Sequence, residues 1–186
     1  MSEVKGDKKI DSENAVKHSN VSLRLNSYDD IFSSFDPRIY SERALSGDFL
    51  EEAKRASRDK SSGELVLQLM VPQKFRDEND ENLIKRRLRE HFRKHYLMLL
   101  KDFKRTKERG ILMTFAGVLF IAIAAYISSL NFNSFLSHFA IVLLEPAGWF
   151  TAWTGLDEMY YTVREKKPDL DFYEKMSNAE LIFIEY

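Results

Sequence analysis

The sequence predicts a membrane α-helical hairpin of two spans with a small cytoplasmic α+β part, which contains two short strands and a basic amphipathic helix. The chain has 186 residues, of which 28 are Lys or Arg and 29 are Asp or Glu. Residues 111–156 hold one charged side chain, Glu145, where the mean charge density would place about 14. An apolar stripe with helical spacing precedes this stretch, and aliphatic runs lie on both sides of it.

Residues 1–27 are polar, poor in aromatic side chains and without periodicity, which predicts a disordered cytoplasmic tail. The cytoplasmic α+β region is expected over residues 28–109. Within it, Ser46 is a candidate N-cap for a short helix over residues 47–57, because its hydroxyl can accept a bond from a backbone N–H of the first turn. Asp48 would then stand in the first turn, where the helix dipole favours an acid.

Two runs are typical of strands, ELVLQLMV at residues 64–71 and AELIFIEY at residues 179–186. A pair of isolated strands is only marginally stable in water. We therefore expect both runs in one sheet, completed within the chain or through a second copy. Residues 157–186 as a whole are predicted to be a cytoplasmic tail that ends in the second strand.

Residues 79–109 predict the basic amphipathic helix. Its apolar residues recur every three or four positions, as on one helix face: Ile84, Leu88, Phe92, Tyr96, Leu99 and Phe103. Basic residues occupy the remaining faces. The helix meets the first span at Gly110, so the two segments could be continuous.

The first span is predicted over residues 111–130, twenty residues without a charge. A helix of that length covers roughly 30 Å, the thickness of the hydrocarbon core of a bilayer. The second span is predicted over residues 135–156. Because Pro146 has no N–H to donate, we expect this span to be kinked or broken at Pro146.

The charged flanks predict the orientation. Residues 85–109 carry eleven Lys or Arg and three acids, and Arg164, Lys166 and Lys167 follow the second span. The loop between the spans has no positive charge. By the positive-inside rule, both termini are expected in the cytoplasm.

Three features resemble an uncharacterised family of small bacterial two-transmembrane-helix membrane proteins. They are the segment DPRIYSERALSGDFLEEAKRASRD, the strand before a basic helix, and the motif GWFTAWTGLDE at residues 148–158. The matching features cover residues 34–186. The resemblance implies a hairpin in the bacterial inner membrane whose last strand returns to the cytoplasmic part, and it implies no activity.

A candidate intramembrane polar site consists of Glu145, His138 and Trp149, which fall on one side of the second span together with Val142. We expect this side to face small residues of the first span: Ala116, Gly117, Ala124 and Ala125. Two interpretations of Glu145 stay open. The carboxyl is either neutral and hydrogen-bonded within the bundle, or it titrates in a water-filled path.

The basic helix supplies candidate headgroup contacts, because cationic side chains next to a span attract anionic lipids. They are Arg93, Lys94, Lys101, Lys104, Arg105, Lys107 and Arg109. The formal net charge of the whole chain is −1, so nucleic acid is not an expected partner. The expected partners are the lipid bilayer, further copies of the chain and an unidentified protein.

His91 and His95 are spaced like two ligands of a zinc site, but no third ligand is evident. Arg86 and His91, or Arg89 and His95, have a spacing similar to the active motif of the HEPN ribonucleases. The chain has no cysteine and no grouped glycines. We therefore expect no metal, no cofactor and no catalytic residues.

These patterns predict an integral membrane protein without enzymatic activity that acts as a scaffold, an anchor or a signalling relay. A homo-oligomeric pore with Glu145 along a polar path is the alternative. A membrane-tethered HEPN-like ribonuclease is a further alternative.

Overall fold

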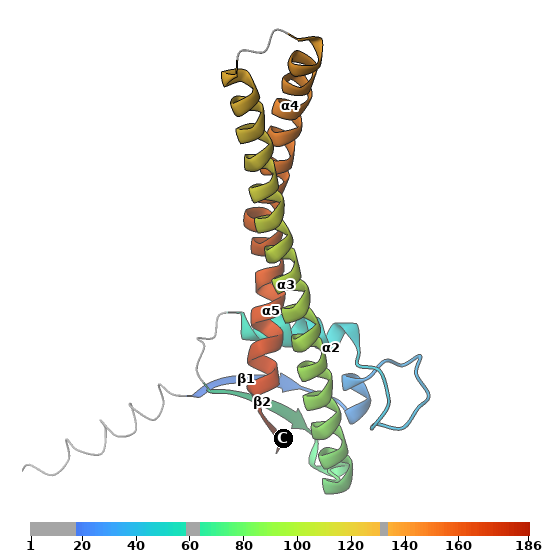
Figure 1. The fold of residues 1–186 in the computed structure, drawn as a ribbon. Coiled ribbons are helices and arrows are strands. Elements are labelled where there is room, and N and C mark those ends of the chain that lie inside the picture. The colour runs from blue at the N-terminus through green and yellow to red at the C-terminus, as the bar shows by residue number, and fades with distance from the viewer. Residues whose placement is uncertain (1–17, 59–63, 131–133) are drawn as a thin grey trace, which may run out of the picture. The chain divides into compact units, whose positions relative to one another are not determined.

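A computed structural model describes residues 18–58, 64–130 and 134–186. These residues divide into two compact units (Figure 1). The α/β unit consists of the described residues up to Tyr96 together with Asp171–Tyr186, and the hairpin unit consists of Leu97–Leu170. Helices α3 (Glu78–Ser129) and α5 (Val163–Asn178) contribute to both units.

The α/β unit contains a three-stranded parallel sheet in the order β1-β2-β3. The strands are β1 (His18–Arg24), β2 (Glu64–Val71) and β3 (Glu180–Glu185). The prediction that the two aliphatic runs share one sheet is confirmed. The prediction of two strands, with a disordered tail through residue 27, is wrong because residues 18–24 form β1. The first 17 residues of that predicted tail lie outside the described residues.

The register of the sheet places alternate side chains on one buried face. Leu67 of β2 lies opposite Val21 of β1 and Leu181 of β3, and all three are buried. On the other face, Ser22 donates a hydrogen bond of 2.8 Å to Gln68. The sequence did not predict β1, because only Val21 and Leu23 are aliphatic among its seven residues and the alternation is therefore weak.

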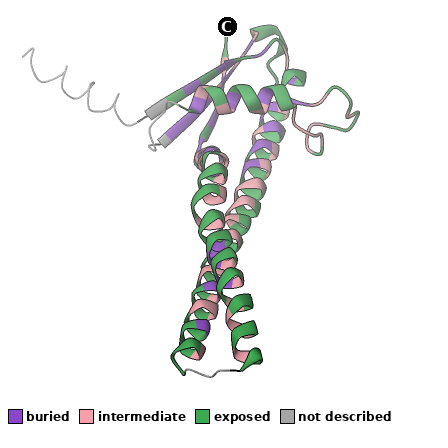
Figure 2. Cartoon of the chain, turned by 90° about the horizontal axis from the view of Figure 1, so that it is seen from above, coloured by how far each residue is buried: buried purple, intermediate pink, exposed green. Residues whose placement is uncertain are grey.

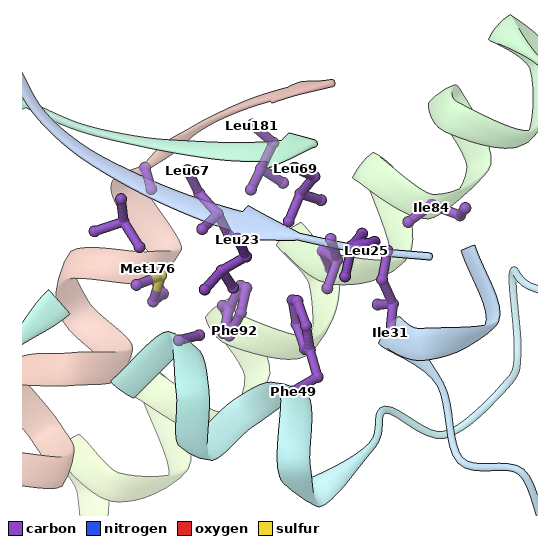
Figure 3. Packing of buried hydrophobic residues seen from close by; sticks show 14 of the residues in the cluster. Leu23, Leu25, Ile31, Phe49, Leu67, Leu69, Ile84, Phe92, Met176 and Leu181 are labelled. Atoms are coloured by element: carbon purple, nitrogen blue, oxygen red, sulfur yellow. The ribbon is translucent and has the colours of Figure 1, made fainter. Parts of the chain in front are cut away.

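The buried face is covered by α2 (Gly47–Ser57), the first turns of α3 and the end of α5 (Figure 3). As predicted, Ser46 caps α2, and its hydroxyl accepts a hydrogen bond from the Phe49 N–H. These helices and the sheet share one hydrophobic cluster. Its largest fully buried side chains are Phe92, Ile31, Leu67, Leu69, Ile84, Leu88, Met176, Val21 and Val71.

A polar network fixes the start of α3 beside the end of β2. Arg76 makes two hydrogen bonds to the Glu81 carboxylate, of 2.6 and 3.0 Å, and the Tyr28 hydroxyl donates a third of 3.0 Å. The Tyr28 oxygen in turn accepts from the Asp77 N–H. Glu81 is only 4% exposed, so its charge depends on these partners. The hydrogen bond to Glu81 raises the pKa of Arg76, and burial raises the pKa of Tyr28.

The loop between the 3₁₀ turn η1 (Tyr28–Ile31) and α2 is held by Asp36. Its carboxylate accepts two hydrogen bonds from the Arg38 guanidinium, of 2.9 and 2.7 Å, and one of 2.7 Å from the Ala44 N–H. The Arg38 hydrogen bonds hold the pKa of Asp36 well below its ordinary value. Phe35 and Ile39 of this loop are 94% and 70% exposed.

In the hairpin unit, α3 packs against α4 (Phe135–Asp157) through small residues. A side chain at Gly117 would collide with the backbone of Ala152, and one at Gly155 would lie 2.6 Å from the Gly110 carbonyl. Such contacts are typical of helices that pack within a membrane. Figure 2 shows the outer surfaces of both helices as mainly exposed.

Both helices are long and apolar enough to cross a membrane. In their most apolar windows only 17% and 11% of the residues are buried, which argues against the core helices of a water-soluble protein. The basic helix and the first span are continuous in α3. The predicted second span continues through Pro146 as one helix, so it is not broken there, and the kink at Pro146 stays a prediction. The proline removes one hydrogen bond, and the neighbouring turns keep their own.

The segment after α4 is mainly helical up to its C-terminal strand. The π-helical turn η3 (Glu158–Thr162) follows α4 and leads into α5. Pro168 is the sixth residue of α5. The predicted C-terminal strand is confirmed as β3.

The Glu81 network leads to a prediction about stability. Replacing Glu81 by Ala leaves Arg76 and the Tyr28 hydroxyl without their buried partner, and should lower the free energy of unfolding of the α/β unit by about 3 kcal/mol. Hydrogen exchange of the β2 amides in the detergent-solubilised full chain measures the loss. Glu90→Ala is the matched control, because Glu90 pairs with Arg86 on an exposed surface and should change exchange little. Equal effects of both substitutions would contradict the assigned role of Glu81.

Candidate functional site

The candidate site is the exposed surface of α4 around Glu145, in the middle of an apolar helix. Glu145 is exposed, and Val142 and Trp149 on the same side are 71% and 66% exposed. The face that contacts α3 instead contains Gly148, Ala152 and Gly155. The prediction that Glu145, His138 and Trp149 face the first span is therefore wrong.

The small residues explain this orientation of α4. Gly117 and Ala124 of α3 are buried, as expected of contact residues, whereas Ala125 is exposed. Close backbone approach requires small residues on both helices. In α4 these residues recur at Gly148, Ala152 and Gly155. Glu145 is seven residues before Ala152, about 20° from it around the helix and about 10 Å nearer the start of α4, where it is exposed.

Two polar groups lie within one turn of each other on this exposed surface. Within the described residues, the Glu145 carboxyl has no hydrogen-bond or ion-pair partner. Pro146 has no N–H, so the Val142 carbonyl lacks the donor that residue 146 would supply in an ordinary helix. A carboxyl and a carbonyl are thus both open to a partner outside the hairpin unit.

Aromatic side chains gather where α4 ends and η3 begins. Trp149, Phe150 and Trp153 are 66%, 80% and 66% exposed. Tyr160 and Tyr161 of η3 are 62% and 64% exposed. Among these residues, Trp153, Tyr160 and Tyr161 lie nearest the end of the apolar helix, where exposed Trp and Tyr are typical of the membrane–water interface.

Polar contacts also lie at this end of α4. The Arg109 guanidinium lies 3.8 Å from Glu158, and the Lys166 ammonium donates a hydrogen bond of 3.0 Å to the Thr106 hydroxyl. The second oxygen of Glu158 is buried and has no partner among the described residues. Glu158 belongs to the π-helical turn, a feature that often marks functional positions in helices.

The candidate headgroup residues are all exposed. Five of them lie in the hairpin unit: Lys101, Lys104, Arg105, Lys107 and Arg109. Arg93 and Lys94 lie in the α/β unit. A shallow groove of about 400 Å³ runs along α3 and is lined by Leu97, Leu100, Lys101, Lys104, Arg105 and Glu108.

The two histidines of α3 form a stacked cluster in the α/β unit. The His91 and His95 rings are 4.0 Å apart, and the His95 ring lies 5.3 Å from that of Tyr173 on α5. The His95 Nδ1–H donates to the His91 carbonyl, at 3.0 Å. The His91 Nε2 is buried and has no partner among the described residues.

Burial keeps His91 neutral. It lowers the pKa of His91 to about 4, and the nearby His95, Arg87 and Lys94 act in the same direction. A neutral imidazole could ligate a metal. However, the described part of the chain contains no group of three His, Cys, Asp or Glu side chains suited to a metal ion.

The geometry does not favour the ribonuclease interpretation. Arg86 and His91 are five residues apart, so they point about 140° away from each other around the helix. Arg86 pairs with Glu90 at the surface, whereas His91 contacts Phe92 and Tyr173. Arg89 and His95 diverge by about 120° on the same argument.

Sequence reasoning missed the buried carboxylate Glu81, although a signal was present. Glu81 lies three and seven residues before Ile84 and Leu88, so the apolar stripe of the basic helix already placed it on the buried face. Glu158, whose second carboxylate oxygen is buried, had no comparable signal in the sequence.

In comparisons with known proteins, no family, no curated protein and no solved structure matches this chain.

The His91 environment leads to a prediction about pH. The pKa is about 4 in the folded chain against 6.5 for a free imidazole, so the unfolded chain binds the proton first as the pH falls. Stability should therefore decrease between about pH 6.5 and pH 4, by at most about 3 kcal/mol from this residue. Chemical denaturation of the α/β unit in the micelle-bound full chain, followed by tyrosine circular dichroism, measures this dependence.

His91→Phe keeps the ring and removes the titration, so it serves as the comparison. The variant should lose less stability than the original chain over the same pH interval. An identical pH dependence in both chains would show that His91 does not contribute.

Proposed function

We propose that this chain is an integral membrane protein that anchors a small α/β unit at the cytoplasmic face of a bacterial inner membrane and presents it to a protein partner. Two apolar helices cross the membrane as a hairpin, and both flanks remain in the cytoplasm. The role is that of an anchor or scaffold, without an enzymatic step. The resemblance to small bacterial two-transmembrane-helix proteins agrees with this proposal.

One observation carries the proposal. Strands β2 and β3 are hydrogen-bonded neighbours, with Leu67 opposite Leu181, and both apolar helices lie between them in the chain. A sheet forms within one compartment, so the residues before and after the hairpin must lie on the same side of the membrane. This requires an even number of crossings, which the two candidate spans provide.

The charges support a cytoplasmic location for the α/β unit. Arg105, Lys107 and Arg109 precede the apolar segment that starts at Ile111, and Arg109 and Arg105 lie about 3 and 9 Å from it along the helix axis. Exposed cations at this depth meet the lipid headgroups. Lys101 and Lys104 are farther from the apolar segment. Arg93 and Lys94 belong to the α/β unit.

The exposed loop of the α/β unit supports a docking role. Phe35 and Ile39 expose 94% and 70% of their surface, although the loop is fixed by the Asp36 contacts. Large apolar side chains on an ordered loop are typical of surfaces that bind another protein. A fixed loop also loses little conformational entropy when it binds.

The topology can be tested with single cysteines, because the chain has none of its own. Phe35→Cys and Lys167→Cys should react with a membrane-impermeant maleimide only after the cells are permeabilised. Ser134→Cys, between the two spans, should react in intact cells. The chain should also resist extraction from membranes by alkaline carbonate. Labelling of Phe35→Cys and Lys167→Cys from opposite sides would contradict the hairpin.

A homo-oligomeric pore is the second candidate, favoured by the exposed Glu145 in the middle of α4. A pore needs several hairpins around a common path, whereas an anchor needs one or two. The mass of the solubilised particle in small lipid discs separates these functions. A monomer or dimer favours the anchor, and a ring of many copies favours the pore.

A further inference from the structure

We propose that the exposed surface of α4 around Glu145, which flanks the contact with α3, is the contact surface for α4 of a second copy of this chain within the membrane. The inference rests on the membrane insertion proposed above. It goes further by naming the surface, the partner and the side chain at its centre.

The depth of Glu145 is the first step. It is the eleventh of the 23 residues of α4, which places it about 15 Å from the start and about 18 Å from the end of the helix. In a spanning helix this is the middle of the hydrocarbon core. A carboxyl group at that depth is unfavourable unless a polar group covers it.

The hairpin itself does not cover the carboxyl. The contact with α3 uses Gly148, Ala152 and Gly155, and Glu145 remains exposed beside them. The nearest ionisable side chain of the same helix, His138, lies seven residues or about 10 Å along the axis. Among the described residues of this unit, none supplies a hydrogen bond to Glu145.

A second unsatisfied group lies on the same face. The Val142 carbonyl has lost its usual donor at Pro146, and the Val142 side chain is 71% exposed. A neutral carboxyl has one O–H donor and further acceptor positions. Glu145 of one copy can therefore donate to the Val142 carbonyl or the carboxyl of the other copy, and accept in return.

A second copy fits better than lipid or an unrelated helix. Lipid tails offer no hydrogen bonds. Copies inserted in the same orientation carry Glu145 at the same depth, and a two-fold axis along the membrane normal brings the two identical faces together. A carboxyl is its own hydrogen-bonding complement, which a self-contacting surface requires. A helix of another protein would need a polar group at the same depth in the membrane as Glu145.

Two neighbouring positions provide a matched crosslinking test of the full chain in membranes. Val142 points within about 60° of Glu145 around the helix, and Leu143 points about 160° away. Both are exposed, at 71% and 59%. With a short bis-maleimide, Val142→Cys should give a product of twice the chain mass, and Leu143→Cys should give at least tenfold less.

Substitution of Glu145 tests its role at the centre of the surface. In the Val142→Cys background, Glu145→Leu should lower the yield of the double-mass product about tenfold at limiting protein-to-lipid ratio. Glu145→Gln keeps a donor and an acceptor and should retain most of the product. Equal crosslinking at Val142→Cys and Leu143→Cys, or an unchanged yield with Glu145→Leu, would overturn the proposal.

Carbonate extraction of the same samples separates this inference from the proposed function. A chain that stays in the membrane without forming the double-mass product overturns only the α4 contact. A chain extracted by carbonate overturns both the anchor and the contact. A Val142→Cys product with the mass of a different protein overturns the second copy as the occupant.

Discussion

The pairing of β3 with β2 is the constraint on which the other features of this chain depend. Parallel strands need a long crossover between them, and here the crossover contains α3, α4 and α5. The two ends of the crossover are fixed in the same core, where the Phe92 ring of α3 meets the Phe172 ring of α5 at a centroid distance of 6.2 Å. The hairpin therefore starts and ends at one folded unit.

The two units place their large apolar side chains in opposite ways. In the α/β unit, Leu67, Phe92 and Met176 are buried and small polar residues are exposed. In the hairpin unit, glycines and alanines form the contact between helices, and Phe150 and Trp153 are exposed. Water drives the first arrangement. The second suits a hydrocarbon solvent, in which helices associate by close packing and not by burial of large side chains.

Three polar side chains in apolar surroundings differ in how the cost of their desolvation is compensated. Glu81 is almost fully buried, and its carboxyl group accepts hydrogen bonds from Arg76 and Tyr28. His91 has no partner at its Nε2 and responds to burial with a lowered pKa. Glu145 has neither partner nor burial within its hairpin. The environment of Glu145 therefore depends on what lies outside the hairpin, such as lipid or another protein.

The sequence alone determined the features that follow from local pattern. The cap at Ser46, the helix after it, the strand runs that became β2 and β3 and the two apolar helices were all predicted within a residue or two, since capping, alternation and span length are local properties. It did not determine β1, because a strand with two aliphatic residues becomes recognisable only when β2 lies beside it.

Only the tertiary structure decided which faces are in contact. Periodicity placed Glu145, Val142 and Trp149 on one side of α4 but could not choose which side packs against α3. Backbone approach at Gly117 and Gly155 made that choice, since helices in close contact tolerate almost no side chain between them. The burial of Glu81 was decided in the same way, by contact with Tyr28, 53 residues earlier in the chain.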